Sequence, residues 1–438
     1  MSRPLRVPIR HVMAVFVGNG LEFYDFLTFS YFSVYIARTF YPDIDPNTGL
    51  LATLISFGVG FVSRPVGAVV IGRMGDRIGR KPAMLLSFGL MGFAILGLAL
   101  TPSYAVIGYA GAGLVVLFRI VQGFALGGEV GPTTAFMAEA APPERRGFYL
   151  CMQYATQDAA SLIAGVIGVV LANVLSDAQL QVWGWRLAML LGASIVPFGL
   201  MLRMSLPETL PSIPAPPPAG PRRSLAHWLS SLPARAKALM AAIRPHLAIV
   251  VLGLMMLTST TIGSYTIGYM TTYALDTLKL AAVFAFGVTI VNGLFSVVSE
   301  VASGWLCDRF GRKPVMIAPM ILLILSIFPC FWAIDRFHNV YALYGAEFVM
   351  VVFAGLCSVP AIVAITEQFP ASIRSGAVAL VYAFAISIFG GSTQPLIKWM
   401  LIVTRNPMAP AYYWTGAALI GLVAMILVKE SAPAKRKV

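Results

Sequence analysis

Twelve long apolar segments recur along this chain, and they constrain its fold more than any other feature. About 20 mostly apolar residues cross a bilayer as a helix, and the hydrocarbon layer offers no water to backbone polar groups. The sequence therefore predicts an all-α membrane protein with twelve transmembrane helices. The segments lie at roughly 11–37, 49–72, 82–100, 105–138, 147–175, 184–203, 246–273, 281–305, 314–334, 339–367, 374–402 and 410–428.

The composition agrees with this prediction, because only 11% of the residues are charged whereas soluble domains have about 25%. The first segment is too long and too polar for a cleavable signal peptide, so we expect it to remain as a membrane helix. No phosphate-binding loop, H-x-x-x-H pair or nucleophile–base set is present, so we expect neither an enzyme nor a bound metal or cofactor. Unrelated spacings argue against a disulfide framework for the four cysteines, Cys151, Cys307, Cys330 and Cys357.

The net charge of +13 raises the question of nucleic-acid binding. The basic residues, however, flank the apolar segments instead of forming one surface, so we expect no nucleic-acid partner. An even number of segments places both termini on one side, where 23 of the Lys and Arg residues fall. The positive-inside rule therefore predicts cytoplasmic termini. As a separate expectation, we place the chain in a plasma membrane of the bacterial inner-membrane type. Only five basic residues fall on the other side: Arg38, Arg186, Lys279, Arg336 and Arg405.

A proline-rich stretch interrupts the pattern after the sixth segment. The run "PETLPSIPAPPPAGPRR" cannot form a regular helix and indicates an extended linker. We therefore expect an N-terminal six-helix half at 1–203, a cytoplasmic linker at 204–243, and a C-terminal six-helix half with a short basic tail at 244–438.

Each half carries one copy of a short charged motif. "GRMGDRIGRK" at 72–81 matches "GWLCDRFGRK" at 304–313 at six positions, and each copy follows the second segment of its half. The glycines permit a tight turn or close backbone approach, and the aspartate can pair with an arginine or a helix N-terminus. The motif predicts cytoplasmic gating loops built from Gly72, Asp76, Arg77, Gly79 and Arg80 and from Gly304, Asp308, Arg309, Gly311 and Arg312.

The repeated motif resembles the signature loop of the major facilitator superfamily, G-x-x-x-D-[RK]-x-G-[RK]-[RK]. Three further runs, "GNGLEFYDF", "FRIVQGFALGGE" and "ITEQFPASIRSG", resemble the metabolite–proton symporter family within that superfamily. The runs "RRGFYLCMQYATQ", "LTSTTIGSYTIGYMTTY" and "ISIFGGSTQPLI" are most similar to its citrate–proton symporter branch. The resemblance spans the whole chain and implies two six-helix halves of major facilitator type.

Arg119 lies near the middle of the fourth segment, where an isolated charge costs at least about 2.5–3.5 kcal/mol. Arginine keeps its proton, so it needs a carboxylate from the protein or from a substrate. Gln122 lies one turn further on the same helical face and can add a hydrogen bond. We expect Arg119 to bind a substrate anion; the alternative is a structural ion pair with Glu22 or Asp25.

Glu22 and Asp25 lie on one helical face in the middle of the first segment. Two carboxylates in a low dielectric cannot both ionise at low cost, so one of them should take up a proton, as proton coupling requires. The residues do not decide which of the two titrates. Glu129, towards the cytoplasmic end of the fourth segment, is a further candidate for proton relay, with a structural hydrogen bond as an equal alternative.

The fifth and seventh segments carry the other candidate ligands. Gln153 and Gln157 are four residues apart and can bind a carboxylate, and Asp158 beside them is a candidate second proton site. The seventh segment carries a polar stripe that suits a cavity wall or, alternatively, hydroxyl packing between helices: Thr258, Thr261, Tyr265 and Tyr269.

Three further ionisable residues have other expected roles. Lys398, in the outer part of the eleventh segment, should extend to the membrane surface. Arg64 and Glu300 lie towards the cytoplasmic side and should support the gate instead of binding substrate.

The resemblance and the intramembrane charges predict a proton-coupled symporter of a small organic anion, such as citrate or another di- or tricarboxylate. Related branches of the family leave a zwitterion or hydroxy acid open, such as betaine or a shikimate-like acid. A drug exporter is disfavoured because the fifth segment lacks a G-P-x-x-G pattern, and a receptor because no signalling domain is evident. We expect a monomer whose partners are the substrate, the proton and the lipid bilayer.

Overall fold

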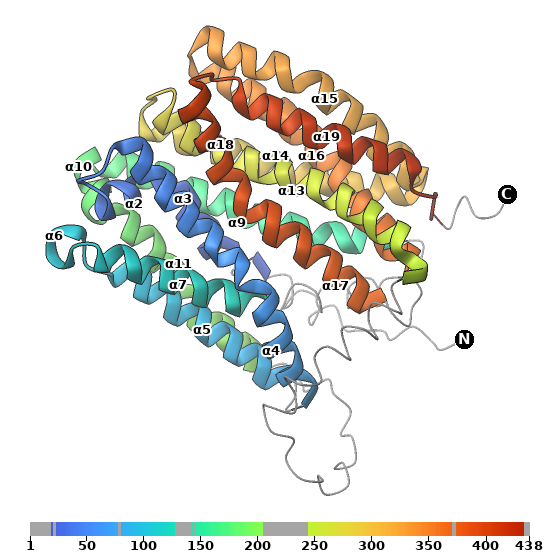
Figure 1. Cartoon of the computed structure of the whole chain (residues 1–438), viewed down its shortest axis with the longest axis horizontal. Helices are drawn as coiled ribbons and strands as arrows, with labels where there is room; N and C mark the ends of the chain where they lie inside the picture. Colours follow the sequence, from blue (N-terminus) through green and yellow to red (C-terminus); the bar gives the residue numbers. More distant parts are fainter. Residues whose placement is uncertain are drawn as a thin grey trace, which may run out of the picture.

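The computed structural model of the chain describes residues 19–20, 23–77, 80–127, 142, 145–204, 244–369 and 374–432 (Figure 1). In the first half, helical residues 23–31 precede α2 (Ser33–Phe40), α3 (Pro46–Val62), α4 (Arg64–Arg77), α5 (Arg80–Leu100), α6 (Tyr104–Ile107), α7 (Ala110–Gly127), α9 (Arg146–Val174), α10 (Asp177–Gln179) and α11 (Trp185–Met204). In the second half follow α13 (Leu247–Asp276), α14 (Ala282–Phe310), α15 (Arg312–Phe337), α16 (Val340–Gln368), α17 (Arg374–Ala385), α18 (Gly391–Thr404) and α19 (Ala409–Leu427).

Each of the twelve predicted segments contains a helix, six in each half, so the predicted all-α fold is confirmed. The second segment is formed by α3 and α4 together, and the eleventh by α17, the π-helix Ile386–Gly390 and α18. Nine helices of the described part are long and apolar enough to cross a bilayer, and Leu85–Leu100 adds a shorter apolar helix. The predicted linker, 204–243, lies outside the described residues except for Met204, where α11 ends.

The sequence determines locally where several helices begin and end. Asp45 precedes Pro46 and accepts a hydrogen bond from the Thr48 N–H at 3.1 Å, which caps α3. Asn339 caps α16 in the same way, accepting the Ala342 N–H at 2.8 Å. Gly311 separates α14 from α15 with a φ of 100°, a conformation that favours glycine, so the second copy of the motif makes a tight turn there.

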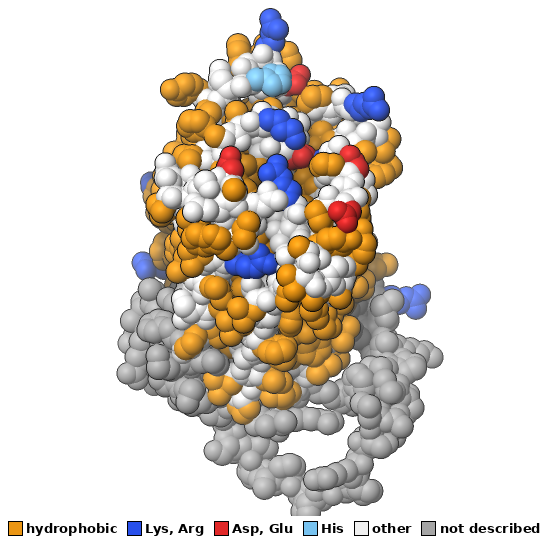
Figure 2. Space-filling model, turned by 90° about the vertical axis from the view of Figure 1, so that its left-hand side faces the viewer, with side chains coloured by type: hydrophobic (Ala, Val, Ile, Leu, Met, Phe, Trp, Pro, Cys, Tyr) orange, Lys and Arg blue, Asp and Glu red, His pale blue; other side chains and the backbone are white. Residues whose placement is uncertain are grey.

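Two hydrophobic clusters form the core, one mostly of the first half around Phe57 and Trp185 and one mostly of the second half around Met350 and Trp414, and each also includes residues of the other half. Large apolar side chains such as Leu325 remain exposed on the outside of the bundle, where lipid would cover them. Figure 2 shows the face that lies on the left of Figure 1, at the end of the bundle with α6 and α10. Charged side chains gather on this face among apolar ones, as expected where helices leave a membrane.

Two helix pairs join the halves: α9 packs along α14, and α3 packs against α18. The first pair is exceptionally close at Gly293 of α14, where an added Cβ would lie 2.4 Å from the backbone nitrogen of Leu162. No larger side chain fits there unless a backbone moves. The absence of a side chain at this position therefore allows the close spacing of α9 and α14.

We expect Gly293→Ala to lower the melting temperature of the purified protein in detergent, because the new methyl group must push α9 away from α14 at a cost of about 1–3 kcal/mol. Gly345→Ala is the matched control, since Gly345 is an exposed glycine of α16 with no atom within 4 Å of the added Cβ. The control should keep or slightly raise the melting temperature. Equal melting temperatures for both variants would contradict the close contact.

Candidate functional site

A cavity lies between the two halves, and about 1040 Å³ of space there, part of it open to solvent, is filled by no atom. The first helix, α4 and α9 line it from the N-terminal half, and α13, α14, α16, α17 and α18 line it from the C-terminal half. A molecule bound here therefore contacts both halves at once. The lining includes an arginine, two carboxyl groups, amides and hydroxyls, among them Arg64, Gln157, Asp158, Tyr265, Glu300 and Gln394.

Three of the predicted substrate ligands line this cavity: Gln157, Thr261 and Tyr265. Two others are not part of its lining. Gln153 is buried on α9 facing the first helix, where Asn19 donates a hydrogen bond to its backbone carbonyl at 3.1 Å. Tyr269 is completely buried in the core of the second half.

Arg119 on α7 is fully buried and does not line the cavity. Its guanidinium lies over the rings of Phe26 and Phe29, 4.5 and 4.6 Å from their centroids, and its Nη1 donates a hydrogen bond to Gln122. Its Nε and Nη2 have no hydrogen-bond partner among the described residues. Arg119 thus adds positive charge behind the cavity wall, with N–H groups still open.

Arg64, which we expected to support the gate, lies in the cavity wall instead. Its guanidinium is 4.1 Å from the centroid of Phe61 and 4.4 Å from that of Phe26, and it hydrogen-bonds Tyr265. Nε and Nη2 remain without a partner in the described part of the chain. The signal in the sequence was the one that identified Arg119, a lone arginine within an apolar run, "GVGFVSRPVGAVV".

Two carboxyl groups from different halves meet in the same cavity. The side chain of Asp158 on α9 hydrogen-bonds that of Glu300 on α14, and Ser296 also bonds Asp158. Glu300, which we had assigned to the gate, is only 4% exposed. Its depth along α14 and its partner on another helix were not readable from the sequence.

The other predicted proton carriers lie elsewhere. Asp25 is 3% exposed and points at α11, where a Cβ added to Gly192 would lie 1.8 Å from its Oδ1. It is not part of the cavity lining. Glu22 and Glu129 lie outside the described residues.

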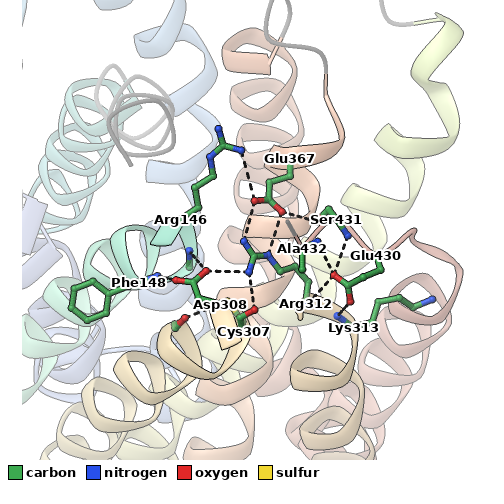
Figure 3. Close-up of polar contacts among 12 residues, drawn as sticks. Arg146, Phe148, Cys307, Asp308, Arg312, Lys313, Glu367, Glu430, Ser431 and Ala432 are labelled. Carbon is green, nitrogen blue, oxygen red and sulfur yellow. Dashed lines mark hydrogen bonds and ion pairs between the residues drawn. The ribbon is translucent and has the colours of Figure 1, made fainter. Parts of the chain in front are cut away.

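At one end of the bundle, which we call the motif end, the second copy of the charged motif joins the two halves (Figure 3). Asp308 accepts hydrogen bonds from the backbone N–H groups of Gly147 and Phe148 at the start of α9, both at 2.9 Å. The N-terminus of a helix favours a carboxylate, because its N–H groups are unpaired and its dipole is positive there. Asp308 therefore attaches α14 to the first turn of a helix in the other half.

Arg312 holds the carboxylates of this end together. It is fully buried, and it donates to Asp308 and to Glu367 at 3.0 Å each. Arg146 on α9 adds an ion pair with Glu367 at 3.8 Å, a second link between the halves. Glu430, just beyond α19, accepts the N–H group of Arg312 at 3.0 Å at the start of α15. These contacts, drawn in Figure 3, form the motif-end latch.

Other residues of the two motif copies contribute less. Arg309 is exposed and extends over the ring of Trp305, 5.3 Å from its centroid. Gly304 packs closely on Cys151 of α9. Gly72 lies inside α4, with no atom within 4 Å of an added Cβ, so no close approach requires glycine there. Outside the described residues lie Gly79 and the side chains of Asp76, Arg77 and Arg80.

A second set of contacts joins the halves at the opposite end of the bundle. The Lys398 Nζ on α18 donates to Asp276 Oδ2 at the end of α13 at 2.5 Å, and to Asn47 Oδ1 at the start of α3 at 2.7 Å. Lys398 is 2% exposed, so the prediction that it extends to the surface is wrong: a carboxylate within reach offsets the cost of burying its charge. We call these contacts the opposite-end latch.

A polar cavity between two helical halves, with polar contacts between the halves at both ends, is the arrangement of a membrane transporter that binds its substrate within the bilayer. The chain belongs to the Major Facilitator Superfamily, whose family model matches residues 15–299 and 287–438. This is a superfamily of transporters, not of enzymes, so the chain is a multi-pass membrane protein of that type.

Comparisons with individual proteins agree. The chain is 32% identical to the citrate–proton symporter of Klebsiella pneumoniae over 425 residues, which cover 97% of this chain and 92% of that protein. It is also 32% identical to the alpha-ketoglutarate permease of Escherichia coli K12 over 411 residues, 94% of this chain and 90% of that one. The crystal structure of a D-xylose–proton symporter has the same fold, with a TM-score of 0.73 at 19% identity and coverage of 97% and 98%. The predicted family resemblance is confirmed.

The opposite-end latch can be tested by labelling a cysteine inside the cavity. Lys398→Met removes the hydrogen bond to Asn47 that crosses between the halves, so the latch should open and a Ser264→Cys thiol in the cavity lining should react with a bulky maleimide about tenfold faster or more. Lys279→Met is the control, because Lys279 is exposed and only 3.7 Å from the Asp276 carboxylate. Equal labelling rates in both backgrounds would show that Lys398 does not hold this end closed.

Glu430 should make the stability of the motif end depend on pH. Burial opposes its ionisation, but backbone N–H groups of Lys313, Ala432, Arg312 and Ser431 outweigh burial and lower the pKa of Glu430 below its ordinary value of 4.5. A lowered pKa contributes stability that is present above the ordinary pKa and is lost as pH falls through the lowered one. Glu430→Gln should therefore lower the melting temperature at pH 7, and the difference from wild type should shrink below about pH 4.

Ser431→Ala is the control for this measurement, since it keeps the backbone N–H that bonds Glu430 and removes only the hydroxyl that donates to Glu367. Its melting curve should keep the pH dependence of the wild type. A Glu430→Gln difference that stays constant from pH 7 to pH 3 would rule out the carboxylate as its source.

Proposed function

We propose that this chain is a proton-coupled symporter of a small organic anion with two or three carboxylates. Relatives named citrate–proton symporter and alpha-ketoglutarate permease support this substrate class. The observation that carries the proposal is the guanidinium of Arg64. It is buried in the cavity wall, and its open N–H groups have no carboxylate partner among the described residues.

An arginine at this depth needs a negative partner, because it cannot shed its proton and the apolar surroundings do not solvate it. The faces of Phe26 and Phe61 compensate part of the cost, and Tyr265 provides one hydrogen bond. A substrate carboxylate in the cavity supplies the rest, and the planar guanidinium can bind it with two parallel hydrogen bonds.

The other predicted ligands surround this position. Gln157, Thr261 and Tyr265 offer an amide and two hydroxyl groups to the remaining oxygens of the substrate. Arg119, held by Gln122 behind the wall, attracts the anion electrostatically without touching it in this conformation. Gln153 and Tyr269 support the cavity wall.

Transport would follow from opening the two latches in alternation. Asp308 and Arg312 close the motif end, which the positive-inside rule assigns to the cytoplasm together with both termini. Lys398, held by Asp276 of its own half, closes the opposite end through its hydrogen bond to Asn47 of the other half. The chain would work as a monomer in a bacterial-type plasma membrane. Of the predicted proton carriers Glu22, Asp25, Glu129 and Asp158, the last lines the cavity.

Uptake by reconstituted protein tests this function. Proteoliposomes with an inward proton gradient should accumulate labelled citrate or 2-oxoglutarate, and unlabelled di- and tricarboxylates should compete. Betaine and shikimate should not compete, because neither presents two carboxylates to the cavity. Competition by betaine or shikimate, with none by the di- and tricarboxylates, would replace the proposed substrate class by the zwitterion or hydroxy-acid alternative.

Arg64→Met in the same assay removes the central anion ligand and should reduce uptake about 10- to 150-fold, the effect of losing a hydrogen-bonded charge of about 1.5–3 kcal/mol. Arg64→Lys should retain part of the uptake, since lysine keeps the positive charge but lacks the planar guanidinium that donates two parallel hydrogen bonds. Arg309→Met is the control, because Arg309 is an exposed arginine of the motif end. Normal uptake by Arg64→Met would exclude this residue as the ligand.

A further inference from the structure

The hydrogen bond between Asp158 and Glu300 requires a proton, which two ionised carboxylates do not supply. Both side chains line the cavity, and they hydrogen-bond each other across the joint between α9 and α14. An ionised carboxylate only accepts hydrogen bonds. Two carboxyl groups can therefore bond each other only when one of them carries a proton.

No cation in the described residues neutralises this pair. Neither carboxyl group forms an ion pair there, and Glu300 Oε2 has no hydrogen-bond partner there. Arg64 lies in the same cavity wall, but it bonds Tyr265 and forms no ion pair with either carboxyl group. A proton is thus the simplest partner that fits.

In the part of the chain that the structure describes, the groups that face the pair are neutral apart from Arg64. On α9 these are Cys151 and Tyr154, both in electrostatic contact with Glu300. The first helix brings Tyr31 near Asp158, and α16 meets Glu300 at Gly355, which has no side chain. The helices α13 and α17 contribute Tyr265 and Tyr382 to the same cavity. Among the described residues, no lysine or arginine forms an ion pair with the two carboxyl groups that would take the place of the proton.

We propose that Asp158 and Glu300 form a two-carboxyl site that holds one exchangeable proton between the halves, and that this is the proton carried with the substrate. The first part of this proposal, the proton site itself, does not depend on the proposed function. The second part, that this proton is carried with the substrate, rests on the proposed symport function. With the proton bound, an O–H···O bond connects α9 to α14. When the O–H bond breaks and the proton leaves to water, two carboxylates remain and repel each other.

The position of the pair makes this repulsion effective. Glu300 lies eight residues before Asp308 on α14, about 12 Å along the helix, and Asp308 binds the first turn of α9, the same helix that carries Asp158. The proton site and the motif-end latch are thus two contacts between one pair of helices. Loss of the hydrogen bond at the proton site favours separation of α9 and α14 at the motif-end latch, so proton release is coupled to opening of that end.

The test separates exchange of substrate from its accumulation. Asp158→Asn and Glu300→Gln each replace one carboxyl group by an amide that can donate a hydrogen bond to the remaining carboxylate, so the pair keeps the single negative charge of the one-proton state. Both variants, reconstituted as full chains, should exchange labelled citrate across the membrane at rates within a few-fold of wild type. An inward proton gradient should not drive accumulation above equilibrium in either variant, and a pH dye should detect no proton uptake with the substrate.

Glu347→Gln is the matched control. Glu347 is another fully buried carboxyl group of the second half, on α16, and it does not line the cavity. This variant should still accumulate substrate. Gradient-driven accumulation by Asp158→Asn and Glu300→Gln at the wild-type level would overturn the proposal. Loss of exchange together with accumulation in both variants, with unchanged melting temperatures, would overturn it too, because the pair would then bind substrate or support the fold.

An infrared titration of the purified protein decides the first part of the proposal without any substrate. The wild type should show a protonated-carboxyl C=O band that is lost as the pH rises, and the Asp158→Asn/Glu300→Gln double variant should lack that titrating band. An unchanged band in the double variant would show that the pair holds no proton. If wild type transports no carboxylate but the band disappears in the double variant, the substrate class is wrong and the proton site stands.

Discussion

The cost of burying charge in an apolar interior determines how this molecule is organised. Lys398 avoids that cost with a carboxylate partner from its own half, Asp276, and it also donates a hydrogen bond to Asn47 of the other half. Arg64 and Arg119 lie against aromatic rings and keep open N–H groups, and Asp158 and Glu300 hydrogen-bond only with a proton between them. These four side chains lie in the cavity wall or directly behind it, where a bound anion and a bound proton complete their interactions.

The joint between α9 and α14 connects these elements mechanically. Its glycine contact at Gly293 fixes the helix spacing, its carboxyl pair faces the cavity, and Asp308 closes its end at the first turn of α9. Packed interfaces of this kind switch between discrete arrangements more readily than they deform continuously. A change of charge at the pair therefore acts on the same two-helix contact that the motif-end latch closes, without needing a longer pathway through the protein.

Hydrophobic segments and the repeated motif made the fold predictable, because a chain in lipid has few ways to satisfy its backbone. The intramembrane charges likewise marked the residues that matter. Their partners were not predictable, since contacts such as Lys398 with Asp276 join segments far apart in sequence. The sequence also does not give the rotation of each helix about its axis or its depth in the membrane. Arg64 and Glu300 were expected at the gate but reach the cavity, and Asp25 faces α11.

A single cavity that holds both ligands has a thermodynamic consequence. An anion bound at Arg64 places negative charge in the same poorly solvated space as the carboxyl pair. That charge is better tolerated when the pair keeps its proton than when both carboxylates are ionised. Binding of the anion and of the proton then favour each other, and by linkage the two effects are equal in free energy. Symport would follow from this mutual preference. The state of the cavity that holds both the anion and the proton becomes more populated, and the states that hold only one of them become less populated.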